Sequence, residues 1–301
     1  MSPPITRITI GAGLIAAAVT ILGADVFLAG VPGIPKDPGF WALLMVVLWQ
    51  GGSEFFRMLR LKGHPVRPIV GLIFIALLVA AAWLDANHPG RALAWLYERG
   101  LELYLLVIVG LVFTTFVAEI RRIERRDGDM GRALASVGWT VLVVLTVGLL
   151  GVFLAKIRFL SPDPKEGLMY LALFLGTVKG SDIGAYAIGS ALGRHKLVPT
   201  LSPKKTVEGL FGGLAAGMLA AILIGCLWVR FAWWPMVLFG LAVSIAAVLG
   251  DLAESLIKRA CGVKDSGPIP GFGGALDILD SVLAAAPVAY LALVVLTGPV
   301  Q

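Results

Sequence analysis

Long apolar segments follow one another along almost the whole of this 301-residue chain. About nine of them are as long, or nearly as long, as the roughly 20 residues that a helix needs to cross a bilayer. Inside lipid the backbone must pair its own hydrogen bonds, which favours helices. The sequence therefore predicts an all-α, polytopic transmembrane helix bundle of about nine spans. These lie near residues 8–29, 38–56, 68–84, 101–119, 135–155, 167–192, 209–229, 234–257 and 279–298.

The loops between these segments differ in positive charge. Most of the 25 lysine and arginine residues lie near the N-terminus or in the loops after the second, fourth, sixth and eighth segments. Basic loops stay in the cytoplasm, so we expect a multi-pass protein of the inner (plasma) membrane with its N-terminus inside. The net charge of +6 then reflects this topology, and we expect no nucleic-acid partner. Cys226 and Cys261 match neither a disulfide framework nor a zinc site.

Polar residues are distributed unequally between the two halves of the chain. Residues 1–160 are interpreted as N-terminal transmembrane helices with few polar side chains. Residues 161–301 are interpreted as catalytic transmembrane helices, and both halves belong to one integral membrane unit. In the first half, Gln50 and Glu54 share a helix face near the cytoplasmic end of their segment and are a minor candidate for joining a site.

Three segments of the second half carry polar residues at helical spacing. Polar faces turned toward lipid are costly, so we expect these stripes to face one another. They would then line a polar, acidic cavity that opens to the cytoplasm. The alternative is that the acids only pair with neighbouring basic residues. The stripes are Lys179, Asp182 and Tyr186; Asp251, Glu254, Ser255, Lys258 and Arg259; and Asp277, Asp280 and Ser281.

The carboxylates of these stripes indicate a cation site. Several carboxylates in one cavity repel one another, and oxygen ligands of this kind favour Mg²⁺. For Asp277 and Asp280 we favour metal binding over simple ion pairing. No basic residue lies within one turn of either of them on their own helix.

Two loops have a composition that suits phosphate groups. Residues 270–274, with sequence PGFGG, precede the last apolar segment, so Gly273 and Gly274 could offer backbone N–H groups at a helix N-terminus. Residues 202–206, with sequence SPKKT, place two lysines and two hydroxyls at the start of another helix. The simpler interpretations are a tight turn for the first loop and a cytoplasmic basic loop for the second.

Together these features indicate phosphoryl or nucleotidyl transfer to a lipid at the inner face of the membrane. In such a reaction the protein positions the substrates and neutralises charge. A Ser-His-Asp arrangement is not apparent, because His64, His88 and His195 all fall in loops. An ion-coupled transporter is the competing non-enzyme hypothesis, since intramembrane acids and lysines also mark translocation paths.

At these residues the sequence resembles the phosphatidate cytidylyltransferases, also called CDP-diacylglycerol synthases. The stretch from Ser255 to Asp280, SLIKRACGVKDSGPIPGFGGALDILD, is similar to the long signature of that family. The upstream motifs KGSDIGAY and LSPKKTVEG also look like family motifs. A signature of this length is far more specific than a short glycine motif.

The resemblance implies an enzyme that makes CDP-diacylglycerol and pyrophosphate from CTP and phosphatidate in the membrane. It implies one or two Mg²⁺ ions held by Asp277, Asp251 and Asp280, and we count Asp182 as a further metal candidate. A homodimer is a further expectation. The remaining implied site residues are Ser202, Lys204, Lys205 and Thr206 for the triphosphate; Lys258, Arg259 and Lys264 for substrate phosphate; and Lys179, Gly273 and Gly274 in the cavity wall and glycine loop.

Two positions depart from the family signature. Phe272 stands where the family has histidine, and Ile278 stands where it has arginine. The resemblance therefore implies an active variant in which Lys258, Arg259 or Lys264 neutralises phosphate charge. Three alternatives stay open: a CDP-archaeol synthase, a CTP-dependent polyprenol or phytol kinase, and a non-catalytic member of the family.

Overall fold

The computed structural model describes residues 4–28, 31, 35–87, 103–126, 129–264, 266–267 and 274–298. These residues form helices, with one β-hairpin. Each apolar segment predicted from the sequence overlaps a helix or a continuous helical stretch. The elements are α1 (Pro4–Leu28), α2 (Pro38–Leu61), α3 (Pro68–Asn87), α5 (Leu103–Arg126), α6 (Met130–Val143), η1 (Val144–Leu149), α7 (Leu150–Arg158), α8 (Pro164–Leu192), β1 (Lys196–Val198), β2 (Ser202–Thr206), α9 (Val207–Ile224), η2 (Gly225–Val229), α10 (Trp233–Ala260) and α11 (Ala275–Thr297).

Six helical stretches of the described residues are long and apolar enough to cross a membrane. The predicted all-helical membrane architecture is confirmed in this coarser form, and the count of nine spans stays a prediction. Helices α2 and α8 are not among the six, and their apolar sequence is interrupted by polar residues such as Glu54 and Asp182. The six stretches are Pro68–Asn87, Leu103–Glu124, Met130–Arg158, Val207–Val229, Trp233–Ala260 and Ala275–Thr297.

The chain divides into two compact units. The first unit comprises Met1–Val152 and Cys261–Asp277, and the second comprises Phe153–Ala260 and Ile278–Gln301. The chain therefore passes from the first unit to the second within α7, returns to the first at the end of α10, and passes to the second again within the first turn of α11. The domain boundary predicted near residue 160 stays a prediction.

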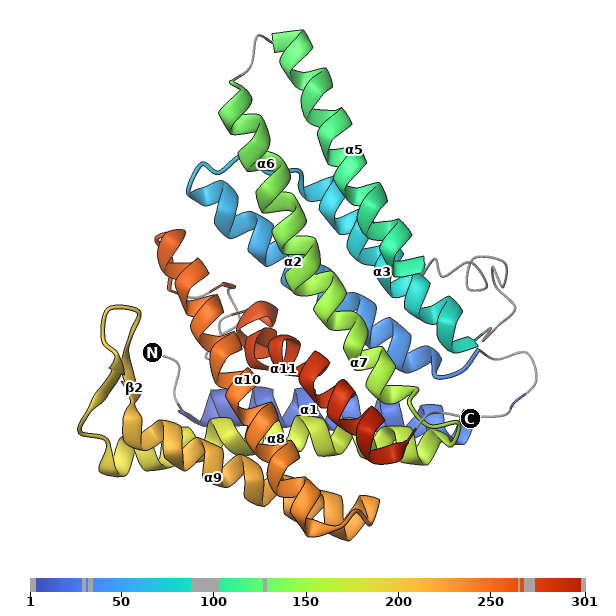
Figure 1. Cartoon of the computed structure of the whole chain (residues 1–301), viewed down its shortest axis with the longest axis vertical. Coiled ribbons are helices and arrows are strands. Elements are labelled where there is room, and N and C mark those ends of the chain that lie inside the picture. Colours follow the sequence, from blue (N-terminus) through green and yellow to red (C-terminus); the bar gives the residue numbers. More distant parts are fainter. Residues whose placement is uncertain are drawn as a thin grey trace. The chain divides into compact units, whose positions relative to one another are not determined.

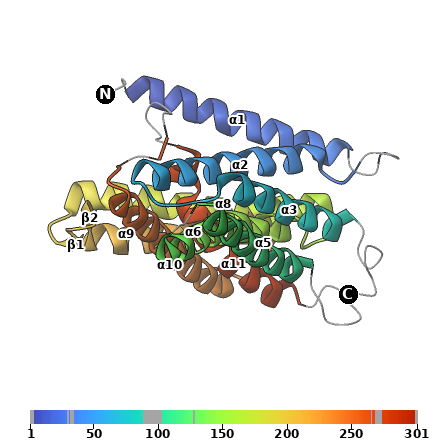
Figure 2. The ribbon, with the colours of Figure 1, turned by 90° about the horizontal axis from the view of Figure 1, so that it is seen from above.

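The first unit is built around α2 and α3, which pack against each other and against η1. Helix α1 lies alongside α2 (Figure 2). The buried carboxylate of Asp25 on α1 accepts hydrogen bonds from the backbone nitrogens of Gly39 (2.9 Å) and Phe40 (2.7 Å). The first N–H groups of a helix have no partner within the helix. Asp25 therefore caps α2 from a different helix.

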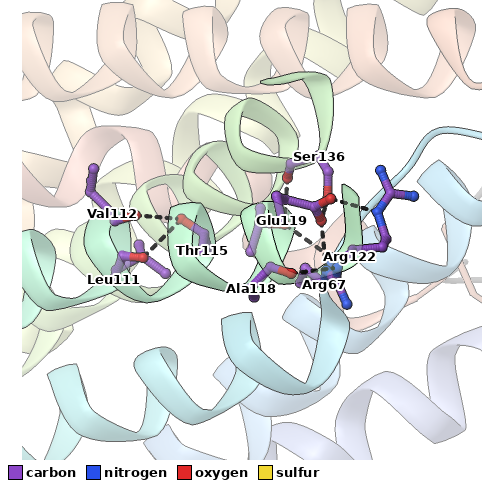
Figure 3. A network of polar contacts seen from close by, with 9 residues as sticks. Arg67, Leu111, Val112, Thr115, Ala118, Glu119, Arg122 and Ser136 are labelled. Carbon is purple, nitrogen blue, oxygen red and sulfur yellow. Dashed lines mark hydrogen bonds and ion pairs between the residues drawn. The ribbon is translucent and has the colours of Figure 1, made fainter. Parts of the chain in front are cut away.

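A buried charge cluster joins α5 and α6 to the start of α3 (Figure 3). Glu119 on α5 is only 3% exposed. Its carboxylate pairs with Arg67 Nε at 2.6 Å and with Arg122 Nε at 2.7 Å. It also accepts a 2.6 Å hydrogen bond from the hydroxyl of Ser136 on α6. Two arginines and a hydroxyl thus compensate the charge of this buried carboxylate, as burial requires.

The second unit contains the closely packed pair α8 and α9, which lie side by side (Figure 1). The antiparallel hairpin of β1 and β2 connects them. Helix α10 packs against both α9 and α8. The backbones of α10 and α11 also come close, because a Cβ atom added at Gly250 would lie 2.7 Å from the carbonyl oxygen of Asp280. This close approach brings the polar stripes of the two helices together.

Candidate active site

Acidic side chains from α10 and α11 meet in the second unit. Asp280 on α11 interacts electrostatically with Asp251 and also lies near Glu254. Asp251 and Glu254 stand one turn apart on α10, so both can reach the same residue of α11. Lys179 on α8 is the cation that interacts with Asp280 from a third helix. The three predicted stripes therefore contribute residues to one cluster.

Lysine side chains lie between these acids. Lys205 Nζ is 2.6 Å from the Asp251 carboxylate, and Lys258 Nζ is 2.5 Å from that of Glu254. On α8, Lys179 and Asp182 form a more exposed pair at 3.0 Å. The ion pairing that we kept as an alternative therefore occurs for Lys179 and Lys258, and Lys205 adds a pair that the sequence did not suggest. The cluster holds charges of both signs within reach of one another.

The acids of the cluster are oxygen donors of the kind that Mg²⁺ prefers. Among the described residues there is no group of three or more acidic, histidine or cysteine side chains that could hold a metal ion by itself. Mg²⁺ is often bound by one or two carboxylates together with substrate phosphates, and Asp251 with Asp280 can offer such a pair. The residues present thus fit a metal that arrives with a nucleotide, and the metal assignment stays a prediction.

The predicted phosphate loop at residues 202–206 is strand β2 of the hairpin. Lys204 is exposed, whereas Lys205 is half-buried against Asp251. The hydroxyl of Thr206 accepts a 3.1 Å hydrogen bond from the Gly209 nitrogen and so caps the N-terminus of α9. Ser202 pairs with Val198 across the hairpin.

The C-terminal end of α10 touches the same hairpin. Arg259 Nε donates a 3.4 Å hydrogen bond to the carbonyl oxygen of Leu201, in the turn before β2. His195 also contributes here, because its Nδ1 atom lies 2.6 Å from the carboxylate of Glu208 at the start of α9. The hairpin is therefore fixed to both α9 and α10. It presents the lysines of the SPKKT sequence beside the acidic cluster.

A second polar cluster lies in the first unit, at the N-terminus of α11. The Asp277 Oδ2 atom accepts hydrogen bonds from the Ser266 nitrogen (2.9 Å), the Ser266 hydroxyl (2.7 Å) and the Gly274 nitrogen (2.7 Å). Glu54 on α2 accepts a 3.0 Å hydrogen bond from the nitrogen of Leu276. The guanidinium group of Arg57 donates to the Ser266 carbonyl oxygen.

Some predicted residues lie elsewhere or outside the described part of the chain. Gly273 and Phe272 are not among the described residues. Lys264 is exposed in the segment between α10 and α11, and Ile278 is half-buried on α11. Asp277 and Asp280 stand on successive turns of α11, and each belongs to the cluster of its own unit.

Sequence reasoning gave too little weight to three polar residues. Glu254 belongs to the predicted stripe of α10 but is not among the predicted site residues. Glu54 was only a minor candidate, and Ser266 was not considered. A signal existed for Ser266, because it follows the Lys264–Asp265 pair within the long signature. For Glu54 the only signal was an acid on an apolar helix.

Comparison with known proteins identifies the class of this one. The sequence profile of the cytidylyltransferase family matches residues 7–296. The chain therefore belongs to the cytidylyltransferase family, and its apolar helices make it a multi-pass membrane protein.

Individual relatives share one name. A phosphatidate cytidylyltransferase of Mycobacterium bovis is 31% identical over 283 residues, which cover 93% of this chain and 88% of the relative. One of Chlamydia pneumoniae is 33% identical, over 81% of this chain and 79% of the relative. One of Brucella suis is 37% identical, over 66% of this chain and 71% of the relative.

Proposed function

We propose that this protein is a phosphatidate cytidylyltransferase, which forms CDP-diacylglycerol and pyrophosphate from CTP and phosphatidate. Family membership and the names of the relatives support the reaction. Within the structure, the observation that carries the proposal is the cluster of Asp251, Asp280, Lys179 and Lys205 on three helices and a hairpin. Such a cluster can bind a polyphosphate, since it supplies cations and also acids for a bridging metal.

In the proposed reaction a phosphate oxygen of phosphatidate attacks the α-phosphorus of CTP. The bond from that phosphorus to the bridging oxygen breaks, and pyrophosphate leaves with the electron pair. The attacking phosphate is already ionised near neutral pH, so the site needs no strong general base. This requirement agrees with a cluster built from lysines and carboxylates rather than from histidine.

Each side chain then has a specific task. Lys204 and Lys205 on the hairpin bind the triphosphate, with Ser202 and Thr206 as hydroxyl partners. Lys258, Arg259 and Lys264 receive phosphate charge, which compensates for Phe272 and Ile278 at positions where the family has histidine and arginine. On nucleotide binding, Lys205 exchanges its partner Asp251 for a phosphate oxygen, and this leaves the Asp251 carboxylate available to a cation.

The proposal includes Mg²⁺ as the cofactor, with Asp251, Asp277 and Asp280 as its carboxylate ligands and Asp182 nearby on α8. When bound, the metal supplies charge neutralisation on the transferred phosphoryl group. We further propose that the protein crosses the inner membrane about nine times and that the polar cavity opens to the cytoplasm, from which CTP enters. Loop charges support this orientation. The homodimer stays a prediction.

The direct test uses the purified chain in detergent with phosphatidate, CTP and Mg²⁺. We expect CDP-diacylglycerol and pyrophosphate in equal amounts, and loss of at least about 100-fold in rate for Asp277→Asn. A matched reaction offers polyprenol, phytol or an archaeal ether lipid as the acceptor. Turnover only with one of these acceptors would replace the proposed substrate, and no turnover with any acceptor or divalent metal would refute the transferase proposal.

A further inference from the structure

We infer that Glu54 is a positioning residue, which fixes the start of α11 and thereby the carboxylate of Asp277. Glu54 lies on α2 and is only 2% exposed. Its Oε2 atom accepts the 3.0 Å hydrogen bond from the nitrogen of Leu276, 222 positions later in the chain. A buried carboxylate needs such partners, because an uncompensated one is costly. Glu54 is thus directed at the first turn of a helix in another part of the sequence.

The first turn of α11 requires a hydrogen-bond acceptor that the residue before the helix does not supply. Gly274 precedes the helix and has no side chain, so it cannot accept the hydrogen bond that an N-cap serine or aspartate would accept. Glu54 performs this function from α2. A side chain at position 274 and the cap from Glu54 exclude each other, because a Cβ atom at Gly274 would lie 2.2 Å from Glu54 Oε2. Glycine at position 274 is therefore required by the carboxylate of Glu54.

Asp277 completes the cap from within α11. Its Oδ2 atom accepts the 2.7 Å hydrogen bond from the Gly274 nitrogen, three residues earlier. This is the second half of a capping box, in which an acid at the third helical position binds back to the residue before the helix. The first half of the box normally comes from the N-cap side chain. Here it comes from Glu54, so the two carboxylates share one helix terminus.

Ser266 connects the two carboxylates directly. Its hydroxyl oxygen is 2.7 Å from Asp277 Oδ2 and 3.2 Å from Glu54 Oε2. A hydroxyl has one hydrogen, so it donates to one carboxylate at a time. The carbonyl group of Ser266 accepts a hydrogen bond from Arg57, which stands one turn beyond Glu54 on α2. Helix α2 thus holds Ser266 and the start of α11 with two neighbouring side chains.

This arrangement assigns a positioning function to α2. The orientation of Asp277 depends on the Ser266 hydroxyl and on the Gly274 nitrogen, and Glu54 is in contact with both residues. The inference rests on the proposed function in one respect, the role of Asp277 in metal binding. The capping contact itself can be tested without that role.

The experiment compares Glu54→Ala and Glu54→Gln with the unmodified full-length chain in detergent. Hydrogen exchange is measured on peptides that cover residues 274–280, and the half-saturating Mg²⁺ concentration is measured in the transferase assay. In Glu54→Ala we expect exchange at the start of α11 to rise about tenfold, because Leu276 loses its acceptor. We also expect the half-saturating Mg²⁺ concentration to rise about tenfold or more. Glu54→Gln keeps an acceptor oxygen and should restore most of both properties.

Glu119→Gln is the matched control, because Glu119 is also a buried glutamate of the first unit, 3% exposed. It should lower thermal stability without changing exchange at residues 274–280 or the Mg²⁺ dependence. Unchanged exchange there in Glu54→Ala would overturn the inference whatever the activity. If the alanine variant does not fold, Glu54→Asp takes its place, because its shorter side chain draws the carboxylate away from Leu276 and unchanged exchange would again overturn the inference.

The remaining outcomes separate this inference from the proposed function. Faster exchange with an unchanged Mg²⁺ dependence would overturn the link between Glu54 and Asp277. A failure of the proposed function would instead be recognised by absent turnover in the unmodified chain.

Discussion

Two clusters of acidic side chains, one around Glu119 and one around Asp280, compensate negative charge in different ways. In the first unit, Glu119 has two arginines and a serine hydroxyl around one carboxylate. In the second unit, Asp280 lies near two other acids, Glu254 and Asp251. The lysines near them are single point charges on flexible stems. The first arrangement is complete without a ligand, whereas the second can rearrange when phosphate and a cation arrive.

A buried charge in a membrane helix is not by itself a sign of a functional site. Glu119 and Asp280 are both acids on apolar helices, and both would be functional candidates on the usual expectation for membrane proteins. Their partners distinguish them. Arginines in fixed geometry indicate a structural contact, and acids gathered with lysines indicate a place where substrate charge can be exchanged.

The largest expected effect is on catalysis in the second region. Asp280→Asn should lower the turnover rate by about 10²- to 10³-fold, because in the proposed reaction it removes a charge that acts on the transferred phosphoryl group. Thermal stability should change little or rise, since one of three neighbouring acids is neutralised. Pyrophosphate release and thermal melting in detergent measure the two properties. A variant with normal turnover would show that the acidic cluster is structural, like the Glu119 cluster.

The next effect is on stability in the first region. Glu119→Gln should reduce the free energy of unfolding by roughly 1–3 kcal/mol, because two arginines lose a charged hydrogen-bond partner. Turnover per folded molecule should stay the same. Thermal melting reports the change, and Glu124→Gln, an exposed position on the same helix, serves as the control with no expected shift. A loss of turnover greater than the loss of folded protein would contradict the distinction between the two regions.

The smallest effect concerns Cys261, which follows α10 in the first unit. Burial raises the pKa of the Cys261 thiol, although the charge of Lys62 opposes this shift. The reactive thiolate is therefore scarcer at neutral pH than for an ordinary cysteine. Alkylation should be slow, and its rate should continue to rise with pH beyond the range of a free thiol. Mass spectrometry of a Cys226→Ala chain measures it, and a fast reaction at pH 7 would show that the segment opens readily.

Much of the fold could be predicted from the sequence, because the length of an apolar run is a local property. Each predicted segment overlaps a helix or a continuous helical stretch, although only six such stretches qualify as spans by length and composition. The hairpin of β1 and β2 was not predicted. Its strands have three and five residues, too few to show a repeating pattern.

The candidate site could be predicted only in part for a physical reason. Helical spacing shows which residues share a face, as for Asp251 and Glu254, but not which face of another helix they meet. The contact of Lys205 with Asp251 joins a hairpin to a helix, and that of Glu54 with Ser266 spans 212 positions. Such contacts depend on how helices pack, which no local pattern encodes.

The cap that Glu54 provides also has a consequence for the order in which the protein is made. Glu54 leaves the ribosome 222 residues before Leu276. At ordinary rates of translation this delay is roughly 10 to 45 seconds. During that time α2 can form, but the carboxylate of Glu54 has only its partner on the same helix, Gln50, and lacks the donors of Leu276 and Ser266. The cap is therefore completed late in synthesis, and a chain that stops before α11 would leave the Glu54 carboxylate without its partners Ser266 and Leu276.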